Sequence, residues 1–226
     1  MNATSSPGPA HGSPDGEPAR APHTAGLLDS SVACFLDALA SPAATPGAGP
    51  AAAWTCAVAA ALIEMAAAIE VRTKGTAGSH AAATVRRDRA HQLRQHALAL
   101  ADADAAAYQA VLTARREPRG HDRATRFREA LSAAVDPPLA IAETASELAQ
   151  LASTTAEQAR GGVRGEATAT AILAEAATAA CIPMLQLNLA NNANDPRLTR
   201  GTQLADDAAQ HRTRAAGTIR MPQAKP

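Results

Sequence analysis

Apolar residues recur along this chain at intervals of three and four, the spacing that places them on one face of an α-helix. Clusters of proline, glycine and polar residues interrupt the pattern and mark where each helix should end. The pattern predicts an all-α chain with helices at residues 27–40, 50–71, 81–116, 121–135, 139–160, 167–191 and 197–216.

A loop rich in proline and glycine, residues 41–53 (SPAATPGAGPAAA), separates the first helix from a long alanine-rich one. Asp29 or Ser30 can cap the first helix. Pro50 suits the first position of the second, because its missing N–H would have no intrahelical partner there. The free N–H groups at that helix start favour an anionic or polar ligand. A rigid connector between two helices explains the same residues.

The larger apolar residues of the alanine-rich helix share one face; they are Trp54, Val58, Leu62, Met65 and Ile69. The next helix carries a narrow stripe of Leu93, Ala97, Leu100, Asp104, Tyr108 and Val111. Asp104 therefore takes a core-facing position, where burial would raise the pKa of its carboxyl towards the range useful for acid/base chemistry. A structural aspartate paired with an arginine across an interface fits the same position, and periodicity leaves both interpretations open.

Composition narrows the class of protein. The chain has 226 residues, with two Phe, one Tyr and one Trp, so its helices should pack closely through alanine. Such packing buries little area, and we expect association with a second copy to add stability. Basic and acidic residues number 21 each, which argues against a nucleic-acid-binding surface. Cys34, Cys56 and Cys181 have no disulfide or zinc spacing and suit a reducing cytoplasm.

The sequence divides into three parts. Residues 1–26, rich in proline, glycine and serine, should be disordered, residues 27–216 should form one helical domain, and residues 217–226 should fray. We expect no membrane span, since the most apolar run is mostly alanine, and no secretory signal.

Five motifs, in order, resemble those of the cyclodeaminase/methenyltetrahydrofolate cyclohydrolase family. They are residues 35–41 (FLDALAS) with 45–49 (TPGAG), 104–108 (DAAAY), 117–120 (EPRG), 130–138, and 172–189 with its ILAEAATAA and LQLNL segments. The chain departs from the family pattern at several positions. Ala48 and Pro50 replace a loop glycine and serine, and Gly165-Glu166 stands where the family has a Ser-Asp pair. Met184 replaces the first of two asparagines, while the second matches Asn188.

The resemblance implies an antiparallel multi-helix fold, a homodimer, and a reduced folate as the small-molecule substrate. It implies Asp104 as the general acid/base. It places substrate-binding residues at Thr45, Pro46, Gly47, Gly49, Tyr108, Arg119, Glu166 and Asn188. The glutamate tail would be held by Arg119, Arg72 or Lys74. No metal or redox cofactor is implied.

The implied reaction is hydrolysis of 5,10-methenyltetrahydrofolate or cyclisation of 5-formiminotetrahydrofolate with loss of ammonia. The altered positions keep two alternatives open. The scaffold could serve another imine or iminium cyclisation in a specialised pathway, or it could be a non-catalytic helical dimer.

Overall fold

The computed structural model describes residues 31–73, 75–118, 120–159 and 161–219, and it confirms the all-α prediction. Within these residues the chain forms α1 (Val32–Ala40), α2 (Ala48–Arg72), α3 (Ala77–Arg116), α4 (His121–Ala133), α5 (Asp136–Gln158), α6 (Gly162–Asn188) and α7 (Pro196–Gly217). The disorder predicted for residues 1–26, and most of the predicted tail, lie outside the described residues.

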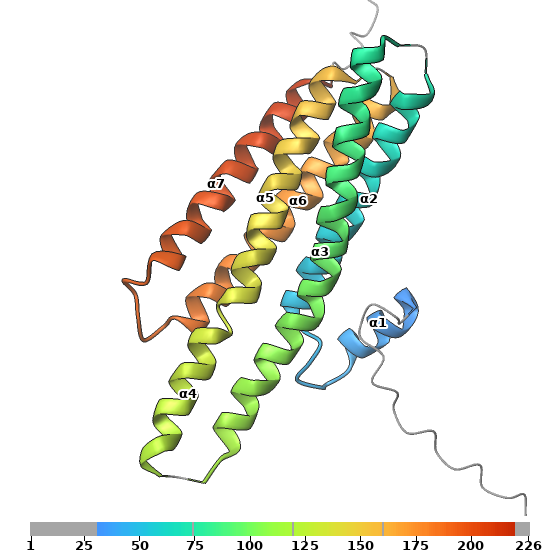
Figure 1. Ribbon diagram of the computed structural model, residues 1–226. Helices are drawn as coiled ribbons and strands as arrows, with labels where there is room; N and C mark the ends of the chain where they lie inside the picture. The colour runs from blue at the N-terminus through green and yellow to red at the C-terminus, as the bar shows by residue number, and fades with distance from the viewer. Residues whose placement is uncertain (1–30, 74, 119, 160, 220–226) are drawn as a thin grey trace, which may run out of the picture.

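Neighbouring helices run side by side along one bundle (Figure 1). Helix α2 packs on both α3 and α6, and α5 packs on α6 and α7. Helix α4 continues beyond the bundle against the last turns of α3, whereas α1 projects from the side (Figure 1). The start of α2, the middle of α3 and the end of α6 therefore meet at one level, which we call the pocket end. The opposite ends of α2 and α6 form the far end.

Helix starts differ from the sequence prediction at every helix except α4: α2, α3, α5, α6 and α7 begin one to five residues earlier than predicted, and α1 is described from Val32. The predicted caps Asp29 and Ser30 lie outside the described residues, and Ser31 caps α1 by accepting a hydrogen bond from the Cys34 N–H at 3.2 Å. Helix α2 begins at Ala48, so Pro50 occupies its first turn two residues beyond the predicted position. Proline fits there for the predicted reason, because N–H groups in the first turn need no intrahelical acceptor.

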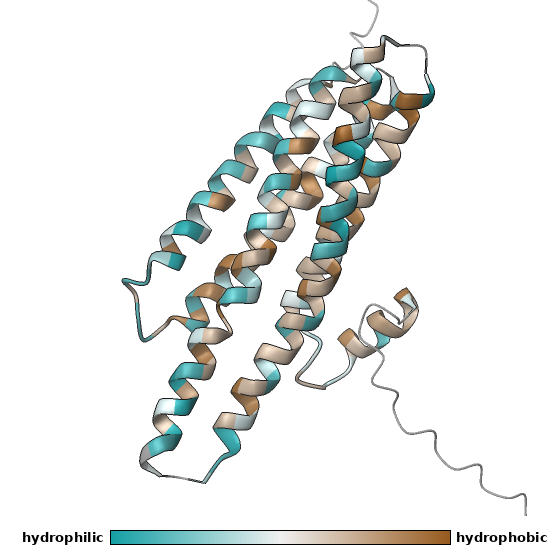
Figure 2. Ribbon diagram, viewed as in Figure 1, coloured by the Kyte–Doolittle hydropathy of each residue, from teal (hydrophilic) through white to brown (hydrophobic). Residues whose placement is uncertain are grey.

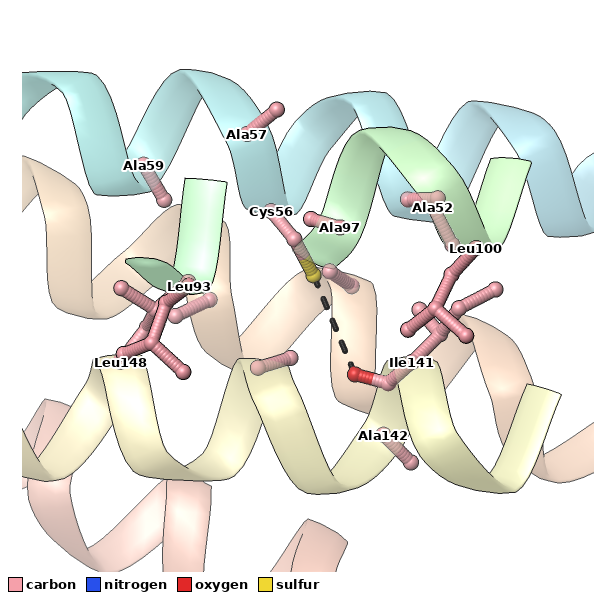
Figure 3. Packing of buried hydrophobic residues seen from close by; sticks show 14 of the residues in the cluster. Ala52, Cys56, Ala57, Ala59, Leu93, Ala97, Leu100, Ile141, Ala142 and Leu148 are labelled. Atoms are coloured by element: carbon pink, nitrogen blue, oxygen red, sulfur yellow. Dashed lines mark hydrogen bonds between the residues drawn. The ribbon is translucent and has the colours of Figure 1, made fainter. Parts of the chain in front are cut away.

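The core combines many alanines with a smaller number of leucine and isoleucine side chains (Figure 3). Ala53, Ala59 and Ala60 of α2 are fully buried, and so is Cys56, whose thiol lies 3.9 Å from the Ile141 carbonyl oxygen of α5. Alanine keeps the helix axes close, which confirms the packing predicted from composition. Burial raises the pKa of the Cys56 thiol well above its ordinary value, so this cysteine stays protonated.

The stripe of large residues on α2 faces outward. Val58, Met65 and Ile69 are 50%, 41% and 40% exposed, while the alanines on the other side of the helix are buried. Helix α2 is drawn in pale to brown hydropathy colours and α7 mostly in teal (Figure 2). Three of the five large residues that share this face are therefore exposed, and Trp54 and Leu62 are half-buried.

By length and composition, both α2 and α6 are apolar enough to cross a membrane, so the expectation that no segment qualifies is wrong on that criterion. Alanine runs raise mean hydropathy without supplying large side chains. About half of the most apolar window is buried inside the bundle, 50% in α2 and 44% in α6. Core helices of a soluble bundle meet the same criterion.

Candidate functional site

A cavity of about 280 Å³ opens at the pocket end between the loop before α2, the middle of α3 and the end of α6. Its walls are largely apolar, with a few polar groups, as is typical of small-molecule sites. The lining residues are Ala44, Thr45, Gly47, Ala48, Gly49, Asp104, Ala105, Tyr108, Ala134, Met184, Leu187 and Asn188.

Asp104 is the ionisable group at the centre of this cavity. It follows Leu100 on the α3 stripe, which brings its carboxylate to the start of α2. It makes no hydrogen bond or ion pair with another described residue, and it is half-buried. Desolvation raises the pKa of its carboxyl to about 6. An unpaired carboxyl with that pKa can accept or donate a proton near neutral pH.

Gly49 brings the backbone of α2 against this carboxylate. A Cβ built on Gly49 would overlap the carboxylate atoms of Asp104, so no side chain fits at this position without a shift. Gly47, two residues earlier, has nothing within 4 Å of its Cβ direction. The two glycines therefore have different roles. Only at Gly49 does the close approach of the Asp104 carboxylate require a residue without a side chain.

The amide of Asn188 supplies a second polar group. Its Nδ2 donates to the Ala134 carbonyl oxygen at 2.8 Å, which ties the end of α6 to the end of α4. The Asn188 Oδ1 remains able to accept a hydrogen bond in the cavity. Tyr108 is 42% exposed and lies one helical turn beyond Asp104, so its ring forms part of the cavity rim.

The Cys181 thiol lies close enough to Asp104 for the charge of that carboxylate to raise its pKa. Burial, and secondly the Asp104 carboxylate, raise the pKa of the Cys181 thiol to about 12. Its Sγ donates to the Ala177 carbonyl oxygen at 3.3 Å within α6. Cys181 is thus a buried, protonated thiol near the carboxylate. Across the described ranges, no group of three His, Cys, Asp or Glu side chains is placed to hold a metal ion.

The structure gathers most of the predicted site residues. Asp104 shares the cavity with five of the predicted substrate-binding residues, namely Thr45, Gly47, Gly49, Tyr108 and Asn188. Pro46 lies in the same loop but does not line the cavity, and Arg119 lies outside the described residues.

Glu166 does not belong to this group. It lies 22 residues before Asn188 on α6, about 33 Å away along the helix axis. Arg72 ends α2 at the same far end, so it cannot reach the cavity of its own chain, and Lys74 lies outside the described residues. Helical periodicity places Glu166 on the correct face of α6 but contains no information about distance along it.

Several lining residues were not among the site residues predicted from the sequence. Ala44, Ala105 and Ala134 are alanines in an alanine-rich chain, and Leu187 is a large apolar residue exposed to 75%. Ala134 takes part through its backbone carbonyl, which no side-chain pattern reveals.

A second, cationic cavity lies further along α3. Its volume is about 400 Å³, and it is lined by Arg115, Gly120, Arg123, Ala124 and Phe127. Arg115 stands 11 residues after Asp104, three helical turns on and on the same face of α3, about 16 Å away. No arginine or lysine lines the first cavity among the described residues, whereas Arg115 and Arg123 give the second cavity its positive charge.

Three comparisons with known proteins agree with this geometry. The family model for formiminotransferase-cyclodeaminase matches residues 31–204. A methenyltetrahydrofolate cyclohydrolase from Methylorubrum extorquens is 33% identical over 144 residues, which cover 62% of this chain and 69% of that protein. The crystal structure of a formiminotetrahydrofolate cyclodeaminase from Thermotoga maritima matches with a TM-score of 0.76 at 19% identity, covering 85% of this chain and 96% of that one.

Proposed function

Since this chain belongs to the formiminotransferase-cyclodeaminase family, we propose that it is a folate one-carbon enzyme in which Asp104 acts as general acid and base. Its substrate would be 5,10-methenyltetrahydrofolate or 5-formiminotetrahydrofolate. The observation that carries the proposal is the unpaired, half-buried Asp104 carboxylate beside Gly49 in an otherwise apolar cavity.

In the hydrolytic direction, water adds to the methenyl carbon that bridges N5 and N10. Asp104 accepts the proton of that water as the carbon becomes tetrahedral. The carboxyl then returns the proton to N5 as the carbon–N5 bond breaks. The hydroxyl on that carbon loses its proton to solvent and becomes the formyl C=O of 10-formyltetrahydrofolate. A pKa of about 6 suits a group that must take and release one proton in each turnover.

In the deaminating direction, N10 attacks the formimino carbon of the substrate. Asp104 accepts the proton that N10 loses and passes it to the departing nitrogen, which leaves as ammonia. The product is the 5,10-methenyl compound, so the two reactions share one bridging carbon and one proton carrier. The relatives carry one or the other activity in their names.

The other polar groups would orient the folate ring. The Asn188 Oδ1 can accept a hydrogen bond from a ring N–H, because its Nδ2 is engaged by Ala134. The apolar walls formed by Met184 and Ala105 would hold the flat face of the ring and exclude water from the carboxylate.

The substrate's glutamate tail is anionic and needs a cation. We propose that it follows the α3–α4 groove from Tyr108 to Arg115 and Arg123. Arg123 donates to the Arg115 carbonyl oxygen at 2.7 Å, which holds its guanidinium across the turn between the two helices. Arg115 and Arg123 thus replace Arg72 as the candidate cations for the tail, because Arg72 lies at the far end.

The substrate test is a spectroscopic assay with two compounds. We expect the protein to accelerate either the loss of 5,10-methenyltetrahydrofolate absorbance above its uncatalysed rate, or its appearance from 5-formiminotetrahydrofolate with release of ammonia. Acceleration of neither reaction by the folded protein would contradict the folate proposal.

The tail test compares substrates with and without the glutamate. Arg115→Ala and Arg123→Ala should each raise KM about tenfold for the glutamate-bearing folate, and leave KM unchanged for the pteroate analogue. Arg128→Ala, an exposed arginine of α4 that does not line either cavity described above, is the matched control. An unchanged KM for both arginine variants would place the tail elsewhere.

The apolar replacement at Met184 supports a second candidate function. With methionine in place of the family asparagine, the cavity offers fewer hydrogen bonds to a polar ring. The same carboxylate could then serve another imine or iminium cyclisation. Absence of binding for any reduced folate by calorimetry, in a folded protein, would favour this candidate.

A further inference from the structure

Arg197, in the first turn of α7, has every N–H of its guanidinium in a hydrogen bond. Its Nε and Nη2 donate to the two carboxylate oxygens of Asp195 at 3.0 and 2.9 Å. Its other donors reach a distant part of the chain. Nη1 donates to the Ser132 carbonyl oxygen at 2.9 Å and to Asp136 Oδ1 at 2.8 Å, and Nη2 donates to Ser132 Oγ at 3.0 Å. A guanidinium has five N–H groups, so none is left for a ligand.

These contacts hold the segment that joins α4 to α5, residues 132–136, which we call the junction. Only Ala134 and Val135 lie between the two helices, and the contacts of Arg197 fall on either side of them. Val135 is fully buried in an apolar cluster with Leu185 of α6. The junction is thus held by apolar packing on α6 and by one polar clamp from α7.

Helix α4 gives the junction little further support. None of residues 122–133 is buried, and α4 makes its main helix contact with α3. The opposite end of α4 is tied to α3 separately, because Arg123 donates to the Arg115 carbonyl oxygen at 2.7 Å. Loss of the Arg197 contacts should therefore release the junction and leave the second cavity in place.

The junction decides which end of the Asn188 amide faces the first cavity. The Ala134 carbonyl oxygen accepts from Asn188 Nδ2 at 2.8 Å, and both residues line that cavity. Because its NH₂ group is engaged, the amide presents Oδ1, an acceptor, to a ligand. Without this partner the amide is free to turn over and present NH₂, a donor. The Ala134 carbonyl therefore sets the hydrogen-bonding character of this wall.

We propose that Arg197 is a positioning residue for the ligand. By holding the junction, it keeps the Ala134 carbonyl against Asn188, so that the Asn188 Oδ1 faces the cavity. The site then selects a ligand with an N–H donor at this point and disfavours one with a carbonyl oxygen there. The proposal rests on the proposed function, because it takes a folate ring as the ligand, and it adds the residue that selects the chemical group on that ring.

The kinetic test removes the clamp and measures KM and kcat separately. Arg197→Met should raise KM about tenfold and leave kcat within about threefold of wild type, because Asn188 binds the ring and does not carry the proton. The rise should be the same for the pteroate analogue, since the second cavity stays in place. An unchanged KM in the folded variant would overturn the proposal.

The chain offers a matched control and a milder variant. Arg200→Met is the control, because this arginine also joins α7 to α5, through Glu143 at 3.4 Å, but does not contact the junction. It should keep wild-type KM and kcat. Arg197→Lys keeps a charge beside Asp195 but has only three donors, so it should raise KM about threefold. It replaces Arg197→Met in every measurement if that variant does not fold.

A double-variant cycle separates positioning from a general loss of stability. Asn188→Ala should itself raise KM about tenfold, because it removes the acceptor from the cavity. If Arg197 acts through this amide, adding Arg197→Met to Asn188→Ala should raise KM further by less than about twofold. A full tenfold effect of Arg197→Met in the Asn188→Ala background would show that Arg197 acts elsewhere, and would overturn the proposal.

A measurement on the ligand-free protein needs no reaction. In ¹⁵N NMR spectra, the side-chain amide protons of Asn188, assigned from their loss in Asn188→Ala, report the hydrogen bond to Ala134. The bonded proton should exchange slowly with solvent in wild type and in Arg200→Met, and about tenfold faster in Arg197→Met. Exchange at the wild-type rate in Arg197→Met would show that the guanidinium does not hold the junction.

These measurements distinguish failure of this proposal from failure of the proposed function. If the wild-type protein accelerates neither folate reaction, the folate function is wrong, and the exchange of the Asn188 amide still decides whether Arg197 positions it. If the wild-type protein is active but Arg197→Met keeps both the wild-type KM and the wild-type exchange rate, the folate function stands and the positioning role is wrong.

Discussion

Helices α2 and α3 have one carboxylate at each end of their contact, and the two carboxylates have different neighbours. At the pocket end, Asp104 of α3 lies against the backbone of Gly49 and has no cationic partner among the described residues. Towards the far end, Glu70 of α2 meets the guanidinium of Arg86, which is 9% exposed and also donates to Gln158 Oε1 at 2.9 Å.

This difference separates a chemical role from a structural one. A carboxylate that is paired with a buried guanidinium joins the two helices through an ion pair. A half-buried carboxylate without a cation keeps a raised pKa and is free to exchange a proton. The α2–α3 pair thus holds both kinds of acid. The carboxylate that faces glycine has the chemical role, and the carboxylate that faces arginine has the structural role.

The largest expected effect comes from removing the unpaired acid. Asp104→Asn should lower kcat by about 10²- to 10⁴-fold, because the amide cannot carry the proton between the attacking and leaving atoms. Steady-state kinetics on the folate substrate would measure the loss. Asp88→Asn, an exposed acid on the same helix, is the control and should keep wild-type kcat. Equal rates for both variants would remove Asp104 from the reaction.

Breaking the ion pair between Arg86 and Glu70 should lower the stability of the fold and leave catalysis unchanged. Arg86→Met leaves the half-buried Glu70 carboxylate without its cation and should lower the free energy of unfolding by about 2 kcal/mol. The KM should not change, because Arg86 lies far from the cavity. Urea denaturation gives the first quantity and kinetics the second. If Glu70→Leu, added to Arg86→Met, recovers no stability, the unpaired charge is not the cause.

Adding a methyl group to Gly49 tests whether its close contact with Asp104 matters for catalysis. Gly49→Ala places a Cβ on the Asp104 carboxylate and should lower kcat/KM by about 100-fold through displacement of that group. Gly78→Ala, in the first turn of α3 at the far end, is the matched control, since its Cβ would meet only Thr76 Oγ1 at 3.9 Å. Wild-type activity for both variants would show that the close approach has no catalytic value.

The smallest effect is on the pH dependence of stability. The Asp104 carboxyl has a pKa of about 6 in the fold and an ordinary value of 3.8, so the folded chain binds more protons than the unfolded one between these limits. Its contribution to stability therefore falls as pH rises from about 4 to about 6. Asp104→Asn should be more stable than wild type by about 1 kcal/mol above pH 6, after allowance for solvent screening, and equal to it near pH 4. Thermal unfolding at the two pH values measures this difference. A variant less stable than wild type above pH 6 would contradict the raised pKa.

The local features of the fold were predictable from the sequence. Helical periodicity placed Asp104 among the buried residues of α3, and proline and glycine clusters marked the ends of the helices. The resemblance to a folate enzyme family, based on short motifs in order, is confirmed by the family match.

Features that depend on packing were not predictable. In most proteins the large side chains of a helix face the core, but here alanine fills the core and Val58 and Met65 face outward. The residue that faces Asp104 could not be identified either, because the contact with Gly49 joins two helices and involves no side chain on the glycine. Glu166 was placed in the site because its face of α6 is right, although its level along the helix is wrong.

The central claim is that Asp104 carries the proton, and the pH dependence of catalysis tests it most directly. We would measure kcat/KM for the folate substrate from pH 4.5 to 8.5, above the uncatalysed rate, in wild type and in Asp104→Asn. The account predicts that wild-type hydrolysis falls as pH drops through about 6, because protonation removes the base, and that the residual activity of the variant lacks this step. A wild-type profile that is flat through pH 6, or the same step retained in the variant, would contradict it.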